Sequence, residues 1–326
     1  MKGYKKMKKT IGILVCLVMI IGLVAACAGG GGGGAGSGGP IKVGIINNPP
    51  EESGYRAANV ADMERVFTAA NGYETQFFYS QTNDAQLNAA RGFITDGVDY
   101  ILLSAADTDG WEAVLRDAKE KGIGVYLFDR MINVPPDLYS AAVVSDMANQ
   151  GDLAMSWLNG LGRNDLKVVH IQGQMGSDAQ RGRTAAFDRE VAAGNMEKVL
   201  QQTASWSEVD AKDIVQSVIN SGVEFNVIYA ENDGMAAGAV AALQEAGITH
   251  GVNGDVIIIG VDANRWALRE VLAGNWNLNV QCSPFQAQVI HELIQGLRPI
   301  IIISEERYFE AGVITQADID RYGLGD

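Results

Sequence analysis

Cysteine and histidine are rare in this chain, and their scarcity excludes several kinds of site. The chain has three cysteines, and only Cys282 lies in the part that we expect to fold. This excludes an intramolecular disulfide framework and a cysteine-based zinc site. The three histidines are His170, His250 and His291. Because they do not have the spacing of metal ligands, we expect them to be structural, and we expect neither a metal nor a cofactor.

Basic residues are also in the minority, which argues against a nucleic-acid partner. The chain has 25 lysines and arginines against 39 acidic residues, and its formal net charge is −14. A protein that binds phosphate backbones needs a clustered basic face, and no helix-turn-helix pattern precedes the folded part. Acid pairs are present, but none lies in a recognisable nucleophile or P-loop context. We therefore expect a binding protein and not an enzyme.

The first 39 residues have the composition of an export signal followed by a tether. Five lysines between Lys2 and Lys9 precede an unbroken apolar run, Ile11–Ala26. This run has the length of a signal-peptide core and is a little short for a transmembrane helix. The glycines of residues 27–39 predict a flexible tether.

The string that ends at Cys27 resembles the lipobox of bacterial lipoproteins. This resemblance implies that residues 1–26 are a lipoprotein signal peptide and that Cys27 is lipidated. The protein would then be extracytoplasmic, at the cell surface or in the periplasm, and attached to the membrane only through its lipid. The alternative is an ordinary membrane anchor in which the cysteine is incidental.

From Pro40 onward, short apolar runs alternate with longer amphipathic segments. The predicted strands are Ile41–Ile46, Thr75–Tyr79, Tyr100–Ser104, Gly124–Phe128, Ser140–Ser145, Lys167–Gln172, Val199–Thr203, Val227–Ala230, Val256–Val261 and Leu278–Val280. Continuous apolar runs suit strands that are buried on both faces of a parallel sheet. Between them lie helical patterns, and Met63, Phe67 and Ala70 share one predicted helix face. This alternation predicts an α/β fold with doubly wound parallel sheets.

The alternation runs through the chain twice, roughly over residues 40–145 and 146–281, which predicts two lobes. In open parallel sheets, a ligand binds beyond the carboxyl ends of the strands. Polar residues follow several predicted strands at that position. They are Asp129, Arg130, Asn232, Asp262 and Gln281, together with Arg183 in a glycine-rich segment.

These residue types suit a polyhydroxylated ligand such as a sugar. Carboxylate, amide and guanidinium groups bind sugar hydroxyls in networks, because each hydroxyl both donates and accepts hydrogen bonds. The C–H faces of a sugar ring favour aromatic walls. Tyr55 and Trp206 lie at or before the starts of predicted helices, where they are placed to supply such walls.

Four stretches of the chain resemble the ribose/galactose class of type I periplasmic binding proteins, and most of all its galactofuranose-binding branch. These stretches are residues 52–58, 108–130, 176–187 and 228–262. The resemblance implies a three-crossover hinge between lobe one, residues 40–145 plus 284–306, and lobe two, residues 146–283 plus 307–326. It further implies a monomer that captures a monosaccharide between the lobes and delivers it to an ABC transporter permease.

The same resemblance implies a set of ligand-binding residues. They are Glu52, Tyr55, Arg56, Asp129, Arg130, Arg183, Trp206, Asn232, Asp262 and Gln281. The chain departs from the galactofuranose-binding branch in having Tyr55 for tryptophan, Gly182 for aspartate and Gln281 for glutamate. The ligand of that branch is therefore not assumed.

Other roles stay open for several of these residues and for the whole protein. Asp129 could belong to a surface ion pair, and Asn232 or Asp262 could cap the helix that follows it. Trp111 could line the cleft or pack inside lobe one. A sugar-sensing lipoprotein that reports to a sensor kinase or chemoreceptor would share every site residue, and a sugar-processing enzyme is a further alternative.

Overall fold

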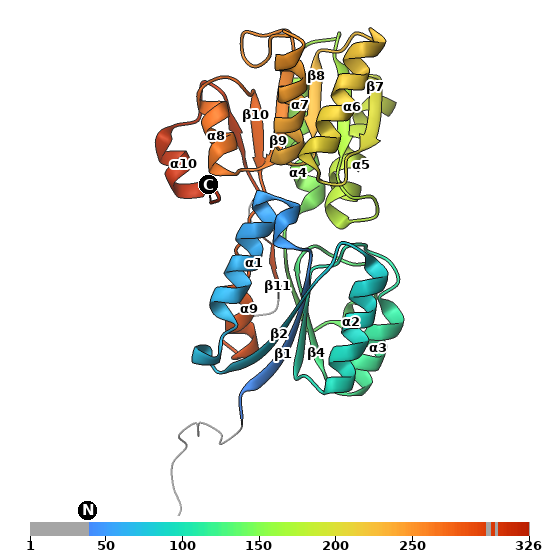
Figure 1. The fold of residues 1–326 in the computed structure, drawn as a ribbon, viewed down its shortest axis with the longest axis vertical. Coiled ribbons are helices and arrows are strands. Elements are labelled where there is room, and N and C mark those ends of the chain that lie inside the picture. Colours follow the sequence, from blue (N-terminus) through green and yellow to red (C-terminus); the bar gives the residue numbers. More distant parts are fainter. Residues whose placement is uncertain (1–38, 298–300, 304–305, 326) are drawn as a thin grey trace, which may run out of the picture. The chain divides into compact units, whose positions relative to one another are not determined.

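The computed structural model describes residues 39–297, 301–303 and 306–325 (Figure 1). The predicted signal peptide, the lipidation site Cys27 and nearly all of the glycine-rich tether lie outside these residues. Within the described ranges, no helix combines the length and apolar character that a membrane span requires.

Two six-stranded sheets form the centres of the two lobes. The strands of the first sheet are β1 (Ile41–Asn47), β2 (Tyr73–Tyr79), β3 (Tyr100–Leu103), β4 (Gly124–Asp129), β5 (Ala141–Val144) and β11 (Ile301–Ile303). Those of the second sheet are β6 (Lys167–Gln172), β7 (Glu197–Thr203), β8 (Val227–Ala230), β9 (Ile257–Asp262), β10 (Leu278–Gln281) and β12 (Tyr308–Glu310).

Ten α-helices accompany these strands among the described residues (Figure 1). They are α1 (Gly54–Val66), α2 (Asn83–Asp96), α3 (Glu112–Glu120), α4 (Met147–Gly160), α5 (Asp178–Ala192), α6 (Glu208–Ser221), α7 (Asp233–Glu245), α8 (Arg265–Leu272), α9 (Ala287–Ile294) and α10 (Gln316–Tyr322).

Both sheets have the same doubly wound topology. The first has the order β11-β5-β4-β3-β1-β2 and the second the order β12-β10-β9-β8-β6-β7. Within the described residues every strand pair is parallel except β10 with β12, which is antiparallel. The strand order reverses at β1 and at β6, so the ligand-binding crevice of such a sheet is expected beyond the carboxyl ends near these strands. The predicted fold class is confirmed.

The chain passes between the two sheets three times. It leaves the first sheet after β5, returns to it with α9 and β11, and leaves it again before β12. Helix α9 packs against α1, and α4 packs against α5 and β10. We call the first sheet with α1, α2, α3 and α9 lobe one, and the second sheet with the remaining helices lobe two.

The continuous apolar runs arise because helices cover both faces of each sheet. Successive side chains of a strand point to opposite faces. In β1, Ile46 packs in the cluster that contains Phe93 and Leu115 of α2 and α3, whereas Ile45 packs in the cluster that contains Met63 and Ile290 of α1 and α9. Both faces of a central strand such as β1 therefore need apolar residues, and its residues 43–46 are all buried and show no polar alternation.

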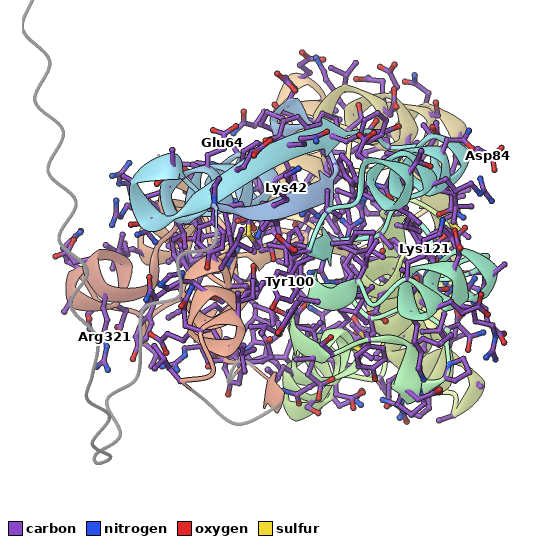
Figure 2. The ribbon with its side chains drawn as sticks, turned by 90° about the horizontal axis from the view of Figure 1, so that it is seen from below. Lys42, Glu64, Asp84, Tyr100, Lys121 and Arg321 are labelled. Atoms are coloured by element: carbon purple, nitrogen blue, oxygen red, sulfur yellow. The ribbon has the colours of Figure 1, made fainter. Side chains whose placement is uncertain are left out.

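Charged side chains cover the outer faces of the helices. Glu64, Asp84 and Lys121 are exposed and lie at the outside of the ribbon in Figure 2. Helices α1 and α2, which carry Glu64 and Asp84, thus have an exposed charged side and bury residues such as Met63 and Phe93 on the other.

Two details differ from the predicted elements. The short strands β11 and β12 were not predicted. Helix α1 ends at Val66, so Ala70 does not belong to it and lies in a separate 3-10 turn. The helix ends there because the side chain of Asn71 donates a hydrogen bond to the Val66 carbonyl, at 2.8 Å, and Thr68 is extended.

Candidate ligand-binding site

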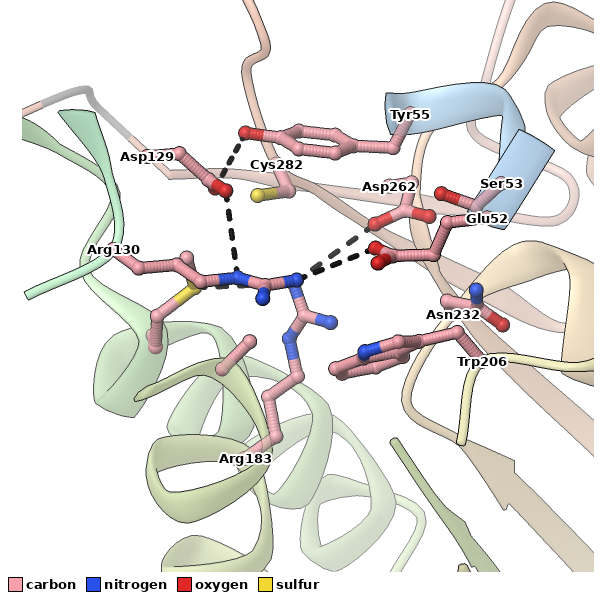
Figure 3. A pocket seen from close by; sticks show the side chains of 12 residues that line it. Glu52, Ser53, Tyr55, Asp129, Arg130, Arg183, Trp206, Asn232, Asp262 and Cys282 are labelled. Carbon is pink, nitrogen blue, oxygen red and sulfur yellow. Dashed lines mark hydrogen bonds and ion pairs between the residues drawn. The ribbon is translucent and has the colours of Figure 1, made fainter. Parts of the chain in front are cut away.

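A small pocket lies between the two lobes at the carboxyl ends of the strands (Figure 3). Its lining residues are Glu52, Ser53, Tyr55, Asp129, Arg130, Met147, Ala179, Arg183, Trp206, Asn232, Asp262 and Cys282. The empty space between them is about 270 Å³, part of which is open to solvent. Figure 3 shows the guanidinium groups of Arg130 and Arg183 near its centre, so a ligand would share this space with both.

Asp129 is the centre of the lobe-one side of the pocket. Its Oδ1 accepts a hydrogen bond from the Tyr55 hydroxyl at 2.7 Å, and its Oδ2 accepts from Arg56 Nη2 at 2.7 Å and from Ser104 Oγ at 2.8 Å. Burial alone would raise the pKa of this carboxyl, but the charges of Arg56 and Arg130 and the hydrogen bonds lower it to about 2. Asp129 is therefore a fixed anion near neutral pH and offers a ligand only acceptor sites.

Glu52 extends this charge network along the pocket wall. Its Oε1 lies 3.5 Å from Arg56 Nε and 3.5 Å from Arg130 Nη2. Arg130 Nε in turn lies 3.4 Å from Asp129 Oδ2. Two carboxylates and two guanidinium groups thus balance one another in a buried position, which is the condition under which buried charges are tolerated.

Arg183 of α5 is the main cation on the lobe-two side. Its Nε donates to Gln150 Oε1 at 2.9 Å, its Nη1 donates to the Glu231 carbonyl, and its Nη2 lies 3.9 Å from Asp262 Oδ1. Burial by itself lowers the pKa of Arg183, but its interactions with Cys282, Asp262, Tyr229 and Glu231 raise it above its ordinary value. Arg183 therefore stays charged and can donate from a fixed position.

Trp206 supplies an aromatic wall beneath both arginines. The guanidinium carbon of Arg130 lies 5.6 Å from its ring centroid and that of Arg183 lies 5.8 Å from it, within the range of cation–π contacts. A Cβ atom at Gly173 would lie 1.8 Å from the indole ring. Only glycine therefore fits at position 173, which explains part of the glycine-rich segment that follows β6.

The indole Nε1 of Trp206 has no hydrogen-bond partner among the described residues, although the side chain is buried. A buried donor without an acceptor is costly.

Asp262 differs from Asp129 in its electrostatic surroundings. Burial and the neighbouring carboxylate of Asp233 raise its pKa well above the ordinary value, and Arg183 only partly opposes this. Asp233 itself is tied down by hydrogen bonds from Asn264 and Asn279. Asp262 can therefore retain a proton, and donate it in a hydrogen bond to a ligand oxygen, at a pH where Asp129 only accepts.

The backbone is unusual where these side chains enter the pocket. Among the described residues, the non-glycine residues with positive φ are Asp129 (65°), Ser205 (50°), Trp206 (72°), Asp262 (126°) and Ala263 (69°). All five lie at or just after the carboxyl ends of β4, β7 and β9. Such conformations carry strain that clusters at functional sites, and here they turn polar side chains into the crevice.

Polar contacts between the lobes surround the pocket. The pairs are Arg181 Nη2 with Asp109 Oδ2 (2.8 Å), Gln174 Nε2 with the Gln81 carbonyl (2.8 Å), the Met131 amide with Asp178 Oδ2 (2.9 Å) and the Thr108 amide with the Gly176 carbonyl (3.1 Å). Since each pair joins lobe one to lobe two, the structure shows the lobes closed on each other.

The sequence pattern of the periplasmic binding protein domain matches residues 43–295. The chain belongs to this family. The galactofuranose-binding protein YtfQ of Escherichia coli (strain K12) is 31% identical over 261 residues, which cover 76% of this chain and 79% of that protein. The fructose import binding protein FruE of Bifidobacterium longum (strain NCC 2705) is 28% identical over 304 residues, or 90% of each chain.

A solved structure shares the fold of this periplasmic binding protein. It is the binding component of the arabinose ABC transporter from Shewanella sp. ANA-3, bound to α- and β-L-arabinofuranose. It has a TM-score of 0.77 and 26% identity, and the match covers 86% of this chain and 95% of that one. The resemblance to sugar-binding proteins of type I, and to the galactofuranose-binding branch, is therefore confirmed.

Eight of the ten sequence-predicted ligand residues line the pocket of this periplasmic binding protein. Arg56 instead lies behind Asp129, where it also donates to Asn47 Oδ1 at 2.7 Å, so it positions the carboxylate. Gln281 is not among the lining residues. Its neighbour Cys282 lines the pocket instead, because side chains alternate along an extended segment.

The structure also decides between several local roles. Asn232 caps α7, since its Oδ1 accepts from the Met235 amide at 2.8 Å, and it lines the pocket as well. Asp262 is not the cap of α8; Asn264 occupies that position. Trp111 is fully buried in the lobe-one core and does not line the pocket.

Gly182 is a packing residue and not a missing ligand group. A Cβ atom there would lie 2.7 Å from the Met147 backbone, so glycine permits the close contact of α4 and α5. Sequence reasoning missed four lining residues: Ser53, Met147, Ala179 and Cys282. Ser53 caps α1 and so had a detectable signal, whereas the other three have no polar character that would mark them.

Proposed function

We propose that this protein is an extracytoplasmic solute-binding lipoprotein that captures a monosaccharide between its lobes and delivers it to an ABC transporter permease. The observation that carries the proposal is the pocket at the facing strand ends of both lobes. It combines a fixed anion, Asp129, and a fixed cation, Arg183, with an aromatic face, Trp206. Because these groups come from both lobes, they support a small polar ligand held between the lobes.

The relatives support a sugar as the ligand. Two relatives of this chain are named for binding galactofuranose and fructose, and a similar structure holds arabinofuranose. Asp129 would accept hydrogen bonds from sugar hydroxyls, while Arg130 and Arg183 would donate to ring and hydroxyl oxygens. Trp206 would lie against a C–H face of the ring.

The mechanism that we propose is capture by hinge closure. The three chain passages near Ser145, Ser283 and Arg307 would act as the hinge, and the contacts between the lobes would form only in the closed state. A ligand shifts this equilibrium only if it binds the closed state better. A sugar would bind the closed state better here, because it can contact Asp129 of lobe one and Arg183 of lobe two together only when the lobes are closed. The permease would recognise the closed form, and Cys27 would carry the lipid.

A ligand screen followed by a conservative variant tests this proposal. A thermal-shift screen over monosaccharides should find at least one that stabilises the protein, by about 2.7 kcal/mol at 100 times its dissociation constant. Arg183→Lys keeps the charge but loses the planar fork that holds Gln150 and the Glu231 carbonyl. We expect it to weaken sugar binding at least tenfold in isothermal titration calorimetry, while Arg189→Lys, an exposed change on the same helix, leaves affinity unchanged.

Three outcomes would contradict parts of the proposal. If no mono- or disaccharide shifts the melting temperature, the ligand is not a sugar. If Arg183→Lys binds the sugar as tightly as the wild type, the pocket is misplaced. If the purified protein converts the bound sugar into a product, it is an enzyme, since a binding protein returns its ligand unchanged.

A further inference from the structure

A second and larger groove opens beside the pocket, also between the lobes. Lobe one lines it with residues 51–54 and Gln81, and lobe two lines it with residues 205–210, Gly234 and Trp266. Its empty volume is about 1200 Å³, against about 270 Å³ for the pocket. Glu52, Ser53 and Trp206 line both spaces. The groove therefore adjoins the pocket and shares a wall with it.

The groove offers the surfaces that a second sugar ring requires. Trp266 supplies a half-buried aromatic face, which is held in place by an edge-on contact with Trp276 at 5.7 Å between ring centroids. Ser205, Ser207 and Gln81 add hydroxyl and amide groups to the lining of the groove. Aromatic rings present large apolar area at low entropic cost, and the polar groups can exchange hydrogen bonds with hydroxyls.

The charge of the groove restricts the kind of unit that it can take. Its described lining residues include exposed carboxylates at Glu51, Glu208 and Asp210 and no lysine or arginine. A phosphorylated sugar or a uronate would meet only like charge there. A neutral ring, whose hydroxyls donate to these carboxylates, fits the charge.

An unpaired donor lies at the boundary between the two spaces. The indole Nε1 of Trp206 is buried and has no partner among the described residues. Figure 3 shows this nitrogen on the edge of the ring that faces Glu52, a residue that lines both pocket and groove. A ligand oxygen at that boundary would satisfy it, and the oxygen that links two sugar rings occupies such a position.

We propose that the groove is a second sugar subsite, so that the protein binds a neutral disaccharide or glycoside with one ring in the pocket and the other against Trp266. This inference rests on the proposed function, because the second ring is linked to one that the pocket already holds. A wholly enclosed site would reject such a ligand, whereas this groove stays open although the lobes are in contact at Arg181 and Asp109.

Matched sugars test the proposal by calorimetry on the purified protein. The monosaccharides are galactose, glucose, fructose, arabinose and xylose, and the disaccharides that carry them at a terminal position are lactose, maltose, sucrose, arabinobiose and xylobiose. We expect the disaccharide of the preferred sugar to bind within threefold of the monosaccharide or more tightly. Binding of a monosaccharide with no binding of its disaccharide overturns the subsite and leaves the proposed function intact. No binding of any mono- or disaccharide, in this set or in the wider thermal-shift screen, overturns both.

Two variants locate the second ring. A Cβ atom at Gly234 would have its nearest neighbours at 3.8 Å, so Gly234→Leu fills the groove without strain. It should weaken disaccharide binding at least tenfold and change monosaccharide binding less than twofold. Gly92→Leu, where a Cβ atom has no neighbour within 4 Å, is the matched control and should change neither.

Trp266→Ala should have the same selective effect as Gly234→Leu, and Trp266→Phe should restore most of the disaccharide affinity. If Trp266→Ala does not fold, the Gly234→Leu result decides alone. Unchanged disaccharide affinity in Gly234→Leu places the second ring elsewhere and overturns the proposal.

Discussion

Replacing Asp129 by asparagine removes one negative charge from a buried cluster and keeps the size of the side chain. Arg56 would lose its nearest carboxylate, since its Nη2 lies 2.7 Å from Asp129 Oδ2 while Glu52 lies 3.5 Å from its Nε. The Arg56 side chain is 0% exposed. Removing one partner of a buried pair costs about 3–5 kcal/mol. Because Glu52 would still balance part of the Arg56 charge, we expect the unfolding free energy to fall by about 2–4 kcal/mol.

The pH dependence of this loss shows whether the lost stability comes from the charge of Asp129 or from the shape of its side chain. The pKa of Asp129 lies at about 2 in the folded protein, against an ordinary value of 3.8. A lowered folded-state pKa stabilises the fold above about pH 4, and this stabilisation disappears as the pH falls through about 2. The contribution is about 2.5 kcal/mol at pH 7 and about half of that at pH 3. The gap between wild type and Asp129→Asn should therefore shrink by about 1 kcal/mol between pH 7 and pH 3.

Urea unfolding followed by circular dichroism at pH 7, 5 and 3 measures this gap. Asp117→Asn is the matched control, because the Asp117 side chain is 47% exposed and pairs with Lys121 at 3.4 Å. It should change the unfolding free energy by less than about 0.5 kcal/mol. A gap for Asp129→Asn below that level, or one that stays constant from pH 7 to pH 3, would refute the assignment of Asp129 as a stabilising buried anion.

Two further substitutions test the contacts around the site. Arg181→Ala removes the ion pair with Asp109 that joins the lobes and should weaken sugar binding about two- to fivefold. This difference in affinity should disappear at high salt, which screens the ion pair. Arg116→Ala, which breaks an ion pair inside lobe one, should leave the dissociation constant unchanged. Gly182→Ala should lower the unfolding free energy by about 1–3 kcal/mol, because a Cβ atom meets the backbone of α4. Gly92→Ala, at a helix position with open space, should instead stabilise by about 0.5–1 kcal/mol in the same chemical denaturation assay.

The central strands could be predicted from the sequence because they are buried on both faces. Runs such as residues 256–261 contain no polar residue, and β9 is buried throughout. The edge strand β11, Ile301–Ile303, carries the same kind of apolar run and could have been predicted, whereas β12, Tyr308–Glu310, has no such run. Strand β12 has three residues and lies next to a chain passage between the lobes, so its pairing depends on the tertiary context.

Polar residues at strand ends were a good guide to the site because parallel strands end at a common edge. This logic found Asp129 and Asp262, which are the last residues of β4 and β9. It could not separate Arg56, which supports the site from behind, from residues that face the pocket. It also could not find Met147 or Cys282, because these enter the pocket from the segments where the chain changes lobe.

The strained backbone at the strand ends has a consequence for how this protein can diversify. Asp129, Trp206 and Asp262 hold positive φ angles that most side chains adopt only at a cost. Aspartate tolerates such angles better than most residues, so exchanging Asp129 or Asp262 for a bulky or β-branched residue adds to this cost before any new ligand is gained. Ser53, Met147 and Ala179 line the same pocket without that restriction. We expect a change of ligand preference, in evolution or in directed selection, to begin at these three positions.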